Sequence, residues 1–111
     1  ERQSQASDGV LSFLHPCVLR ATAQVVQAAL KHGVGLTVCG EAAGNPAAAC
    51  LLVGMGVRCL SVSPFQAMRI RHVLRHLTIE QAERCVRYAL DASVPEDVEQ
   101  IVASVLGGTA L

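Results

Sequence analysis

Two short apolar runs constrain the fold of this 111-residue chain more than any other feature. Residues 36–39 lie between Gly35 and Gly40, and residues 59–63 end at Pro64. Apolar runs of this length with glycine or proline at their ends are typical of strands buried on both faces of a parallel sheet. Segments with helical spacing of apolar residues precede and follow each run. The order helix, strand, helix, strand therefore predicts an α/β fold.

Helix boundaries are marked by proline, glycine and capping residues. Proline at the first helical position predicts helices that begin at Pro16 and Pro46. Glycine predicts where they end, at Gly33 for the first and at Gly54 with Gly56 for the second. Three further helices are expected over residues 65–77, 78–92 and 95–106, with capping boxes at residues 78–81 and 93–96.

The composition excludes several classes of protein. Hydrophobic residues make up 51% of the chain and the formal net charge is zero, which excludes a disordered chain and a general nucleic-acid binder. The longest apolar stretch, residues 47–57, is shorter than the roughly 18 residues of a membrane span. No secretory signal is expected, because the first residues are polar. Aromatic residues make up only 3%, so the chain is expected to form part of a larger core.

The cysteines indicate a reducing compartment. Their number is odd and no two have Cys-x-x-Cys spacing, which argues against a disulfide framework or a four-cysteine zinc site. Most of them are expected to be reduced, buried and structural, in a cytoplasmic protein. They are Cys17, Cys39, Cys50, Cys59 and Cys85.

His72 and His76 have the spacing of a two-histidine metal pair on a helix. Position 73 is valine, where such a motif has glutamate, and arginines at positions 69, 71 and 75 would repel a cation. A solvated basic face is therefore the favoured interpretation. Residues 58–90 hold six arginines against two glutamates, so a phosphate-facing basic patch is the alternative.

Cys39 is the strongest candidate for chemistry. It ends the first predicted strand, and a loop of glycine and alanine leads from it to the helix start at Asn45 and Pro46. In parallel α/β folds, catalytic groups gather at the carboxyl ends of strands. Small loop residues and a helix N-terminus also suit an anion. A structural role for Cys39 remains the alternative.

Three segments resemble the phosphoenolpyruvate-utilising enzymes, in particular phosphoenolpyruvate–protein phosphotransferase, which is enzyme I of the bacterial phosphotransferase system. They are Leu-His-Pro-Cys-Val-Leu-Arg at residues 14–20, Cys-Gly-Glu-Ala-Ala-Gly at 39–44, and Leu-Leu-Val-Gly-Met-Gly-Val at 51–57 with Leu-Ser-Val-Ser at 60–63. The resemblance implies that residues 1–111 are the C-terminal portion of a phosphoenolpyruvate-binding (β/α)₈ TIM barrel. That portion comprises the last two strand–helix units plus terminal helices.

The resemblance also assigns roles to residues. Cys39 would be the proton donor that converts enolpyruvate to pyruvate, which suits a thiol, since its reference pKa of about 8.5 keeps it mostly protonated at neutral pH. Arg2 would clamp the substrate, although Glu1 stands where the family has aspartate. The Mg²⁺ ligands and the phosphorylated histidine would lie outside this chain. The chain alone would then be inactive.

The implied parent is a cytoplasmic transferase that dimerises, passes phosphate to a phosphocarrier protein and serves sugar transport or its regulation. Two alternatives remain. Ser63-Pro64-Phe65 resembles pyruvate phosphate dikinase, which together with phosphoenolpyruvate synthase uses the same barrel with another phosphoryl acceptor. The other alternative is a non-catalytic α/β interaction module in which Cys39 is a core residue.

Overall fold

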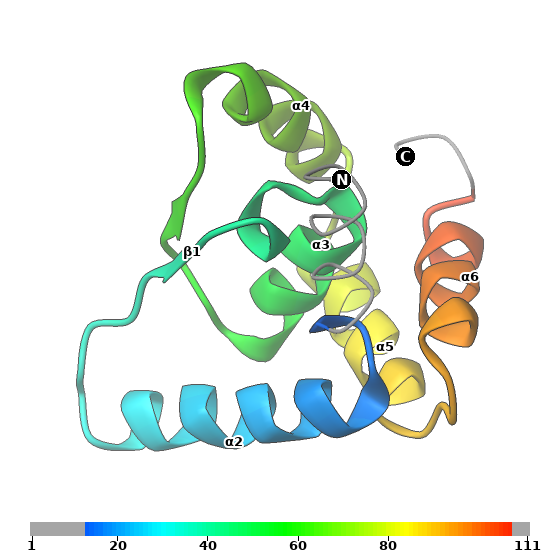
Figure 1. Ribbon diagram of the computed structural model, residues 1–111, viewed down its shortest axis with the longest axis horizontal. Helices are drawn as coiled ribbons and strands as arrows, with labels where there is room; N and C mark the ends of the chain where they lie inside the picture. The colour runs from blue at the N-terminus through cyan, green and yellow to red at the C-terminus, as the bar shows by residue number, and fades with distance from the viewer. Residues whose placement is uncertain (1–12, 108–111) are drawn as a thin grey trace, which may run out of the picture.

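The structure is a computed structural model that describes residues 13–107. Helices dominate it, and one small parallel sheet lies at their side (Figure 1). The predicted order of helix, strand, helix and strand is confirmed, as are the helix starts at Pro16 and Pro46. The elements are α2 (Pro16–Lys31), β1 (Val38–Cys39), the 3₁₀-helix η1 (Ala42–Gly44), α3 (Pro46–Met55), β2 (Leu60–Ser61), α4 (Pro64–Arg75), α5 (Ile79–Leu90) and α6 (Pro95–Val105).

Polar side chains fix where most of the helices begin. The Asn45 side chain accepts a hydrogen bond from the Ala48 N–H at 3.0 Å, which satisfies a free donor in the first turn of α3. The predicted capping box at residues 78–81 is confirmed at the start of α5. The predicted box at residues 93–96 is wrong, because Val94 occupies the N-cap of α6 and makes no side-chain cap hydrogen bond. Ser93 lies one position too early to cap a helix whose first residue is Pro95.

The end of α3 differs from the prediction at one glycine. The helix runs through Gly54 and ends at Gly56, whose φ of +117° is a left-handed conformation that favours glycine. Gly54 has another function, because a Cβ there would collide with the backbone carbonyl of Ala82 in α5. Gly54 therefore marks a close approach of α3 and α5 and does not stop the helix.

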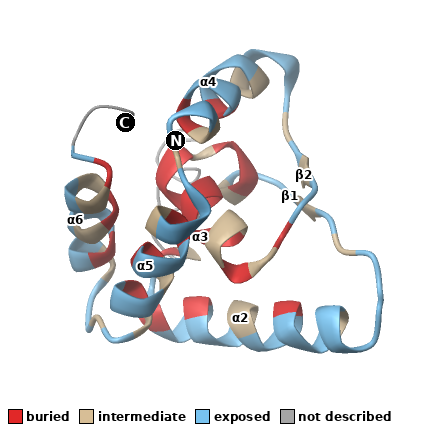
Figure 2. Ribbon diagram, turned by 180° about the vertical axis from the view of Figure 1, so that it is seen from behind, coloured by how far each residue is buried: buried red, intermediate tan, exposed pale blue. Residues whose placement is uncertain are grey.

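Helix α3 is the centre of the core. It contacts α2, α4, α5, α6 and η1, and most of its residues are buried (Figure 2). A helix that is apolar on all sides is stable in water only when neighbours surround it. The buried residues of α3 are Pro46, Ala47, Ala48, Ala49, Cys50, Leu51, Leu52 and Met55.

The sheet positions the candidate site. Strands β1 and β2 pair in parallel, with Val38 opposite Leu60 and Cys39 opposite Ser61, and α3 connects them as a βαβ unit. The prediction that both strands are buried on both faces is wrong. Val38 and Leu60 are half-buried, whereas Cys39 and Ser61 are exposed, because no element of residues 13–107 covers their face of the sheet. The complete barrel stays a prediction, since this part of the chain supplies two strands.

Candidate active site at the carboxyl ends of the strands

A polar pocket of about 460 Å³ lies where β1 and β2 end. Both strands point their carboxyl ends toward it, which is the usual position of active sites in parallel α/β folds. Its lining comes from the segment after β1 and from the segment between β2 and the first turn of α4. The lining residues are Cys39, Gly40, Glu41, Ser61, Val62, Ser63 and Gln66.

The loop after Cys39 is built from small residues for a structural reason. Gly40 has a φ of +90°, which lets the chain turn away from the strand immediately after the cysteine. Ala43 and Gly44 are buried in η1, so that a larger side chain has no space there. The Asn45 cap then begins α3. The loop is therefore held at both ends, by the turn at Gly40 and by the cap at Asn45. Cys39 immediately precedes the loop and lines the polar pocket.

The Cys39 thiol is exposed and makes no hydrogen bond within the described part of the chain. The expectation that most cysteines are buried is wrong, because Cys17 and Cys59 are exposed as well. Cys17 accepts a hydrogen bond from the guanidinium of Arg20, with Nη2 and Sγ 3.3 Å apart. As an exposed residue, Cys39 also does not fit the alternative in which it is a core residue.

Cys50 and Cys85 are the two structural cysteines. Both are fully buried where α3 packs on α5. Burial, with a smaller contribution from the neighbouring Cys85, raises the pKa of the Cys50 thiol from 9.0 to about 12. Burial also raises the pKa of Cys85. These two thiols therefore stay protonated and out of contact with solvent, and neither suits a proton donor to a bound substrate.

The histidine pair has the geometry of a helix surface. The rings of His72 and His76 lie 4.8 Å apart, and the Nδ1 atom of His76 is 2.8 Å from the His72 carbonyl oxygen. Both side chains are exposed, as are the three arginines beside them. Across residues 13–107, no group of three or more His, Cys, Asp or Glu side chains is placed to hold a metal ion. The exposure of these five side chains is what a solvated basic face predicts.

The described residues do not fit Mg²⁺ at the strand ends. Glu41 is the one carboxylate that lines the polar pocket, and Mg²⁺ sites in proteins need further oxygen ligands. That its ligands lie outside this chain stays a prediction. Arg2, the predicted substrate clamp, lies outside the described residues. No helix in the described ranges is long and apolar enough to cross a membrane.

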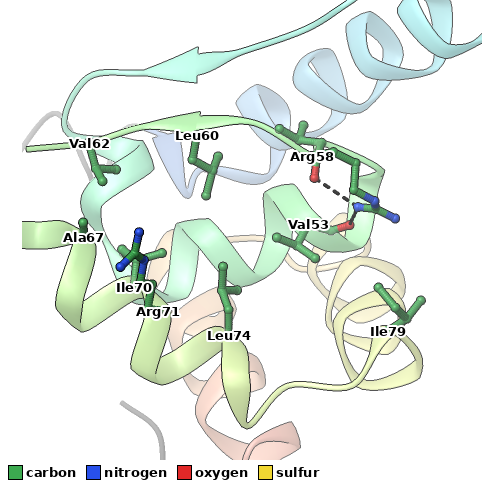
Figure 3. Close-up of a pocket in the computed structure, with 10 residues that line it drawn as sticks. Val53, Arg58, Leu60, Val62, Ala67, Ile70, Arg71, Leu74 and Ile79 are labelled. Carbon is green, nitrogen blue, oxygen red and sulfur yellow. Dashed lines mark hydrogen bonds between the residues drawn. The ribbon is translucent and has the colours of Figure 1, made fainter.

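A second pocket, of about 440 Å³, lies on the other side of β2 and has a different character (Figure 3). Aliphatic side chains from β2, α3, α4 and α5 line it, together with Arg58 and Arg71. Arg58 is already engaged, since its Nη1 donates to the carbonyl oxygens of Val53 and Val57, both at 3.0 Å (Figure 3). This apolar pocket is lined by no Ser, Thr, Cys, His, Asp or Glu side chain, so the polar pocket is the better candidate.

Sequence reasoning missed part of the polar pocket. Ser61 and Ser63 lack the Gly-x-Ser-x-Gly context of a catalytic serine, so the sequence did not indicate either of them as a site residue. Gln66 ends the Ser-x-x-Gln capping box that begins α4, and this motif was the signal in the sequence that could have found it. The position of both serines at the end of the second strand was the signal that could have found them, because parallel strands end at one edge of a sheet.

Comparison with known proteins shows which family the chain is similar to. Residues 1–79 match the family described as PEP-utilising enzyme, PEP-binding domain. The chain is 35% identical over 106 residues to a Salmonella typhimurium protein named "Phosphoenolpyruvate-dependent phosphotransferase system", covering 96% of this chain and 14% of that protein. It is 37% identical over 97 residues to a Cupriavidus necator "Phosphoenolpyruvate-protein phosphotransferase", covering 87% of this chain and 17% of that protein.

A third relative, the Streptomyces coelicolor "Phosphoenolpyruvate-protein phosphotransferase", is 33% identical over 108 residues, which is 97% of this chain and 19% of that protein. The chain thus spans less than a fifth of the length of each of these relatives. The family match, in contrast, includes both strands, the Cys39 loop and α4. The chain therefore belongs to the family of phosphoenolpyruvate-utilising enzymes, through their phosphoenolpyruvate-binding domain.

Proposed function

We propose that residues 1–111 are the C-terminal portion of the barrel domain of a phosphoenolpyruvate–protein phosphotransferase. The parent enzyme takes the phosphoryl group of phosphoenolpyruvate onto a histidine that lies outside this chain. Three observations support this: the family match, the names of the relatives, and two consecutive strand–helix units with parallel strands. As the last two units of a (β/α)₈ barrel, they need the preceding units to close the sheet.

Cys39 is the proton donor in this proposal. Loss of the phosphoryl group leaves enolpyruvate as its enolate, whose C2–C3 electron pair takes the proton from the Cys39 thiol. A C–H bond forms at C3, the S–H bond breaks, and pyruvate and the Cys39 thiolate result. Solvent then returns a proton to the sulfur. The observation that carries this role is the exposed thiol at the end of β1, in a polar pocket that small residues leave open.

The remaining parts of the reaction are assigned to residues outside the described structure. Arg2 is proposed to hold the phosphate or carboxylate of the substrate, for which a guanidinium is suited by its paired N–H donors. Mg²⁺, when bound by residues of the parent, would neutralise charge on the phosphate and enolate oxygens. Because the phosphorylated histidine and the Mg²⁺ ligands are proposed to lie outside this chain, the isolated chain is expected not to transfer phosphate.

The partners follow from the same assignment. The parent is proposed to be a cytoplasmic homodimer that passes the phosphoryl group to the phosphocarrier protein of the phosphotransferase system. The pyruvate phosphate dikinase-type enzyme remains the second candidate, favoured by Ser63-Pro64-Phe65 at the start of α4. The two candidates differ in the phosphoryl acceptor and share the role of Cys39, so incubation with each acceptor separates them.

Chemical modification tests the role of Cys39 directly. Iodoacetamide should alkylate Cys39 in the full-length enzyme and stop the conversion of phosphoenolpyruvate to pyruvate, and phosphoenolpyruvate with Mg²⁺ should protect both the thiol and the activity. Peptide mass spectrometry distinguishes Cys39 from Cys17 and Cys59, which are also exposed. Full activity after complete alkylation of Cys39 would remove the proposed role of this thiol.

A further inference from the structure

Ser61 is the direct neighbour of Cys39 across the sheet. The two residues are Cα partners in the parallel register of β1 and β2, and paired residues on adjacent parallel strands point their side chains to the same face. Both are exposed on that face, and both line the polar pocket. The Ser61 hydroxyl and the Cys39 thiol, which is the proposed proton donor, therefore lie side by side at the strand ends.

Of the two serines that line the polar pocket, Ser61 is the one whose hydroxyl is not used in a helix cap. Ser63 is engaged in the capping box of α4, where its Oγ accepts from the Gln66 N–H at 3.3 Å and donates to Gln66 Oε1 at 3.1 Å. Ser61 makes no side-chain hydrogen bond within residues 13–107, and neither does Cys39. The Ser61 hydroxyl is therefore free to rotate toward a neighbour.

The charge that develops on Cys39 needs such a donor. When the thiol gives up its proton, the sulfur becomes an anion, and a hydrogen bond to the charged form favours that form. Glu41 is the one charged side chain that lines the pocket, and a carboxylate repels a thiolate. The Ser63 hydroxyl already donates to Gln66 Oε1, whereas Ser61 is the direct cross-strand neighbour of Cys39, so the Ser61 hydroxyl is the adjacent side-chain donor on the sheet.

We propose that Ser61 is a positioning residue for the proton transfer, and that its hydroxyl donates a hydrogen bond to the Cys39 sulfur as the thiolate forms. The inference rests on the proposed function of Cys39 and adds a second residue to it. No bond to Ser61 is made or broken in this step. The S–H proton goes to C3 of enolpyruvate, and the Ser61 proton stays on its oxygen.

The variant Ser61→Ala in the full-length enzyme tests the proposal through two separate readouts. The first is the pH midpoint of iodoacetamide alkylation of Cys39, followed by peptide mass spectrometry, which needs no catalysis. It should move upward by about one pH unit, since a hydrogen bond to a charged group is worth roughly a tenfold change in that equilibrium. The second is the rate of conversion of phosphoenolpyruvate to pyruvate at neutral pH, which should fall about tenfold.

Two further variants complete the design. Ser61→Thr retains the hydroxyl in a residue that suits a strand, and should restore both the midpoint and the rate. Ser104→Ala removes an exposed serine from α6, outside the polar pocket, and should change neither. This pair separates the loss of the hydroxyl beside Cys39 from the loss of a serine elsewhere.

The outcomes distinguish the inference from the proposed function. A midpoint and a rate within twofold of the wild type in Ser61→Ala overturn the inference and leave the role of Cys39 intact. A slower rate with an unshifted midpoint also overturns it, because a merely structural serine gives that result. A shifted midpoint with an unchanged rate overturns it as well. If alkylation of Cys39 itself leaves the activity unchanged, the proposed function fails instead.

Discussion

The side-chain amide of Gln66 occupies the space that a Cβ at Gly44 would need, with Gln66 Oε1 only 2.6 Å from that position. Gly44 ends the loop that carries Cys39, and Gln66 lies in the first turn of α4. The same Gln66 oxygen closes the capping box of α4 with Ser63. The close packing of Gln66 against Gly44 thus joins the loop after Cys39 to the first turn of α4, which lines the opposite side of the polar pocket.

The variant Gly44→Ala is expected to break this contact. The added methyl group must displace the Gln66 amide, which opens the capping box and lowers the free energy of unfolding by about 1 kcal/mol. Urea denaturation measures the change. In a Gln66→Ala background the box is already lost, so Gly44→Ala should cost much less there. Equal costs in both backgrounds would show that the two residues are not coupled.

The contact between Gly44 and Gln66 illustrates what the sequence predicts and what it does not. Local signals placed the helix starts correctly, because proline and a capping side chain act within one turn. Gly44 and Gln66 are separated by more than twenty residues, so neither position alone indicates the other. Gly54 was misread for the same reason, since its requirement comes from Ala82 in another helix.

Gly54→Ala is predicted to destabilise the protein although alanine is the better helix former. Alanine is favoured over glycine inside a helix by about 1 kcal/mol. The new Cβ, however, collides with the backbone of α5, which cannot move unless the whole helix moves, and this costs roughly 1–3 kcal/mol or more. Thermal denaturation should show a net decrease in Tm. Gly35→Ala is the matched control, because nothing lies within 4 Å of its Cβ position. A Tm unchanged or raised in Gly54→Ala would contradict the close approach of α3 and α5.

Asn45 is predicted to stabilise the start of α3 through its side-chain oxygen. Asn45→Ala leaves the Ala48 N–H without its partner and should cost about 1 kcal/mol in the free energy of unfolding. Asn45→Asp keeps an acceptor at the same position and adds a charge that suits a helix N-terminus, so it should retain the stability. Urea denaturation of the three proteins checks this, and an equal loss in both variants would exclude the cap as the cause.

The buried cysteines predict a loss of stability at alkaline pH. The pKa of Cys50 is raised from 9.0 to about 12 in the folded protein, so above pH 9 the unfolded chain releases a proton that the folded protein keeps. Stability therefore falls as the pH rises from 9 toward 12, by at most about 1.4 kcal/mol per pH unit from this thiol. Cys85 contributes in the same direction.

The measurement is the free energy of unfolding between pH 8 and pH 11. The double variant Cys50→Ala/Cys85→Ala should show a shallower decrease than the wild type, whatever its absolute stability. The variant Cys17→Ala/Cys59→Ala removes two exposed cysteines instead and should keep the wild-type slope. Equal slopes in all three proteins would show that the buried thiols do not cause the effect.

The candidate site could be predicted from the sequence as far as Cys39 and its loop. A cysteine at the end of an apolar run, followed by glycine and alanine, is a local pattern, and the resemblance to a known family added its role. The prediction that both strands are buried on both faces was wrong, because burial of a strand depends on how many neighbours the sheet has. Ser61 was not predicted as its partner, since the register between the strands is set by packing across the sheet.

The most direct test of the proposed function is the rate at which the full-length Cys39→Ala enzyme converts phosphoenolpyruvate to pyruvate. Alanine has no proton to donate, so we predict a rate at least about 100-fold below the wild type. Cys59→Ala is the matched control, because Cys59 is exposed near β2 but does not line the polar pocket, and it should keep the wild-type rate. A Cys39→Ala enzyme that forms pyruvate within twofold of the wild-type rate would contradict the assignment of Cys39 as the proton donor.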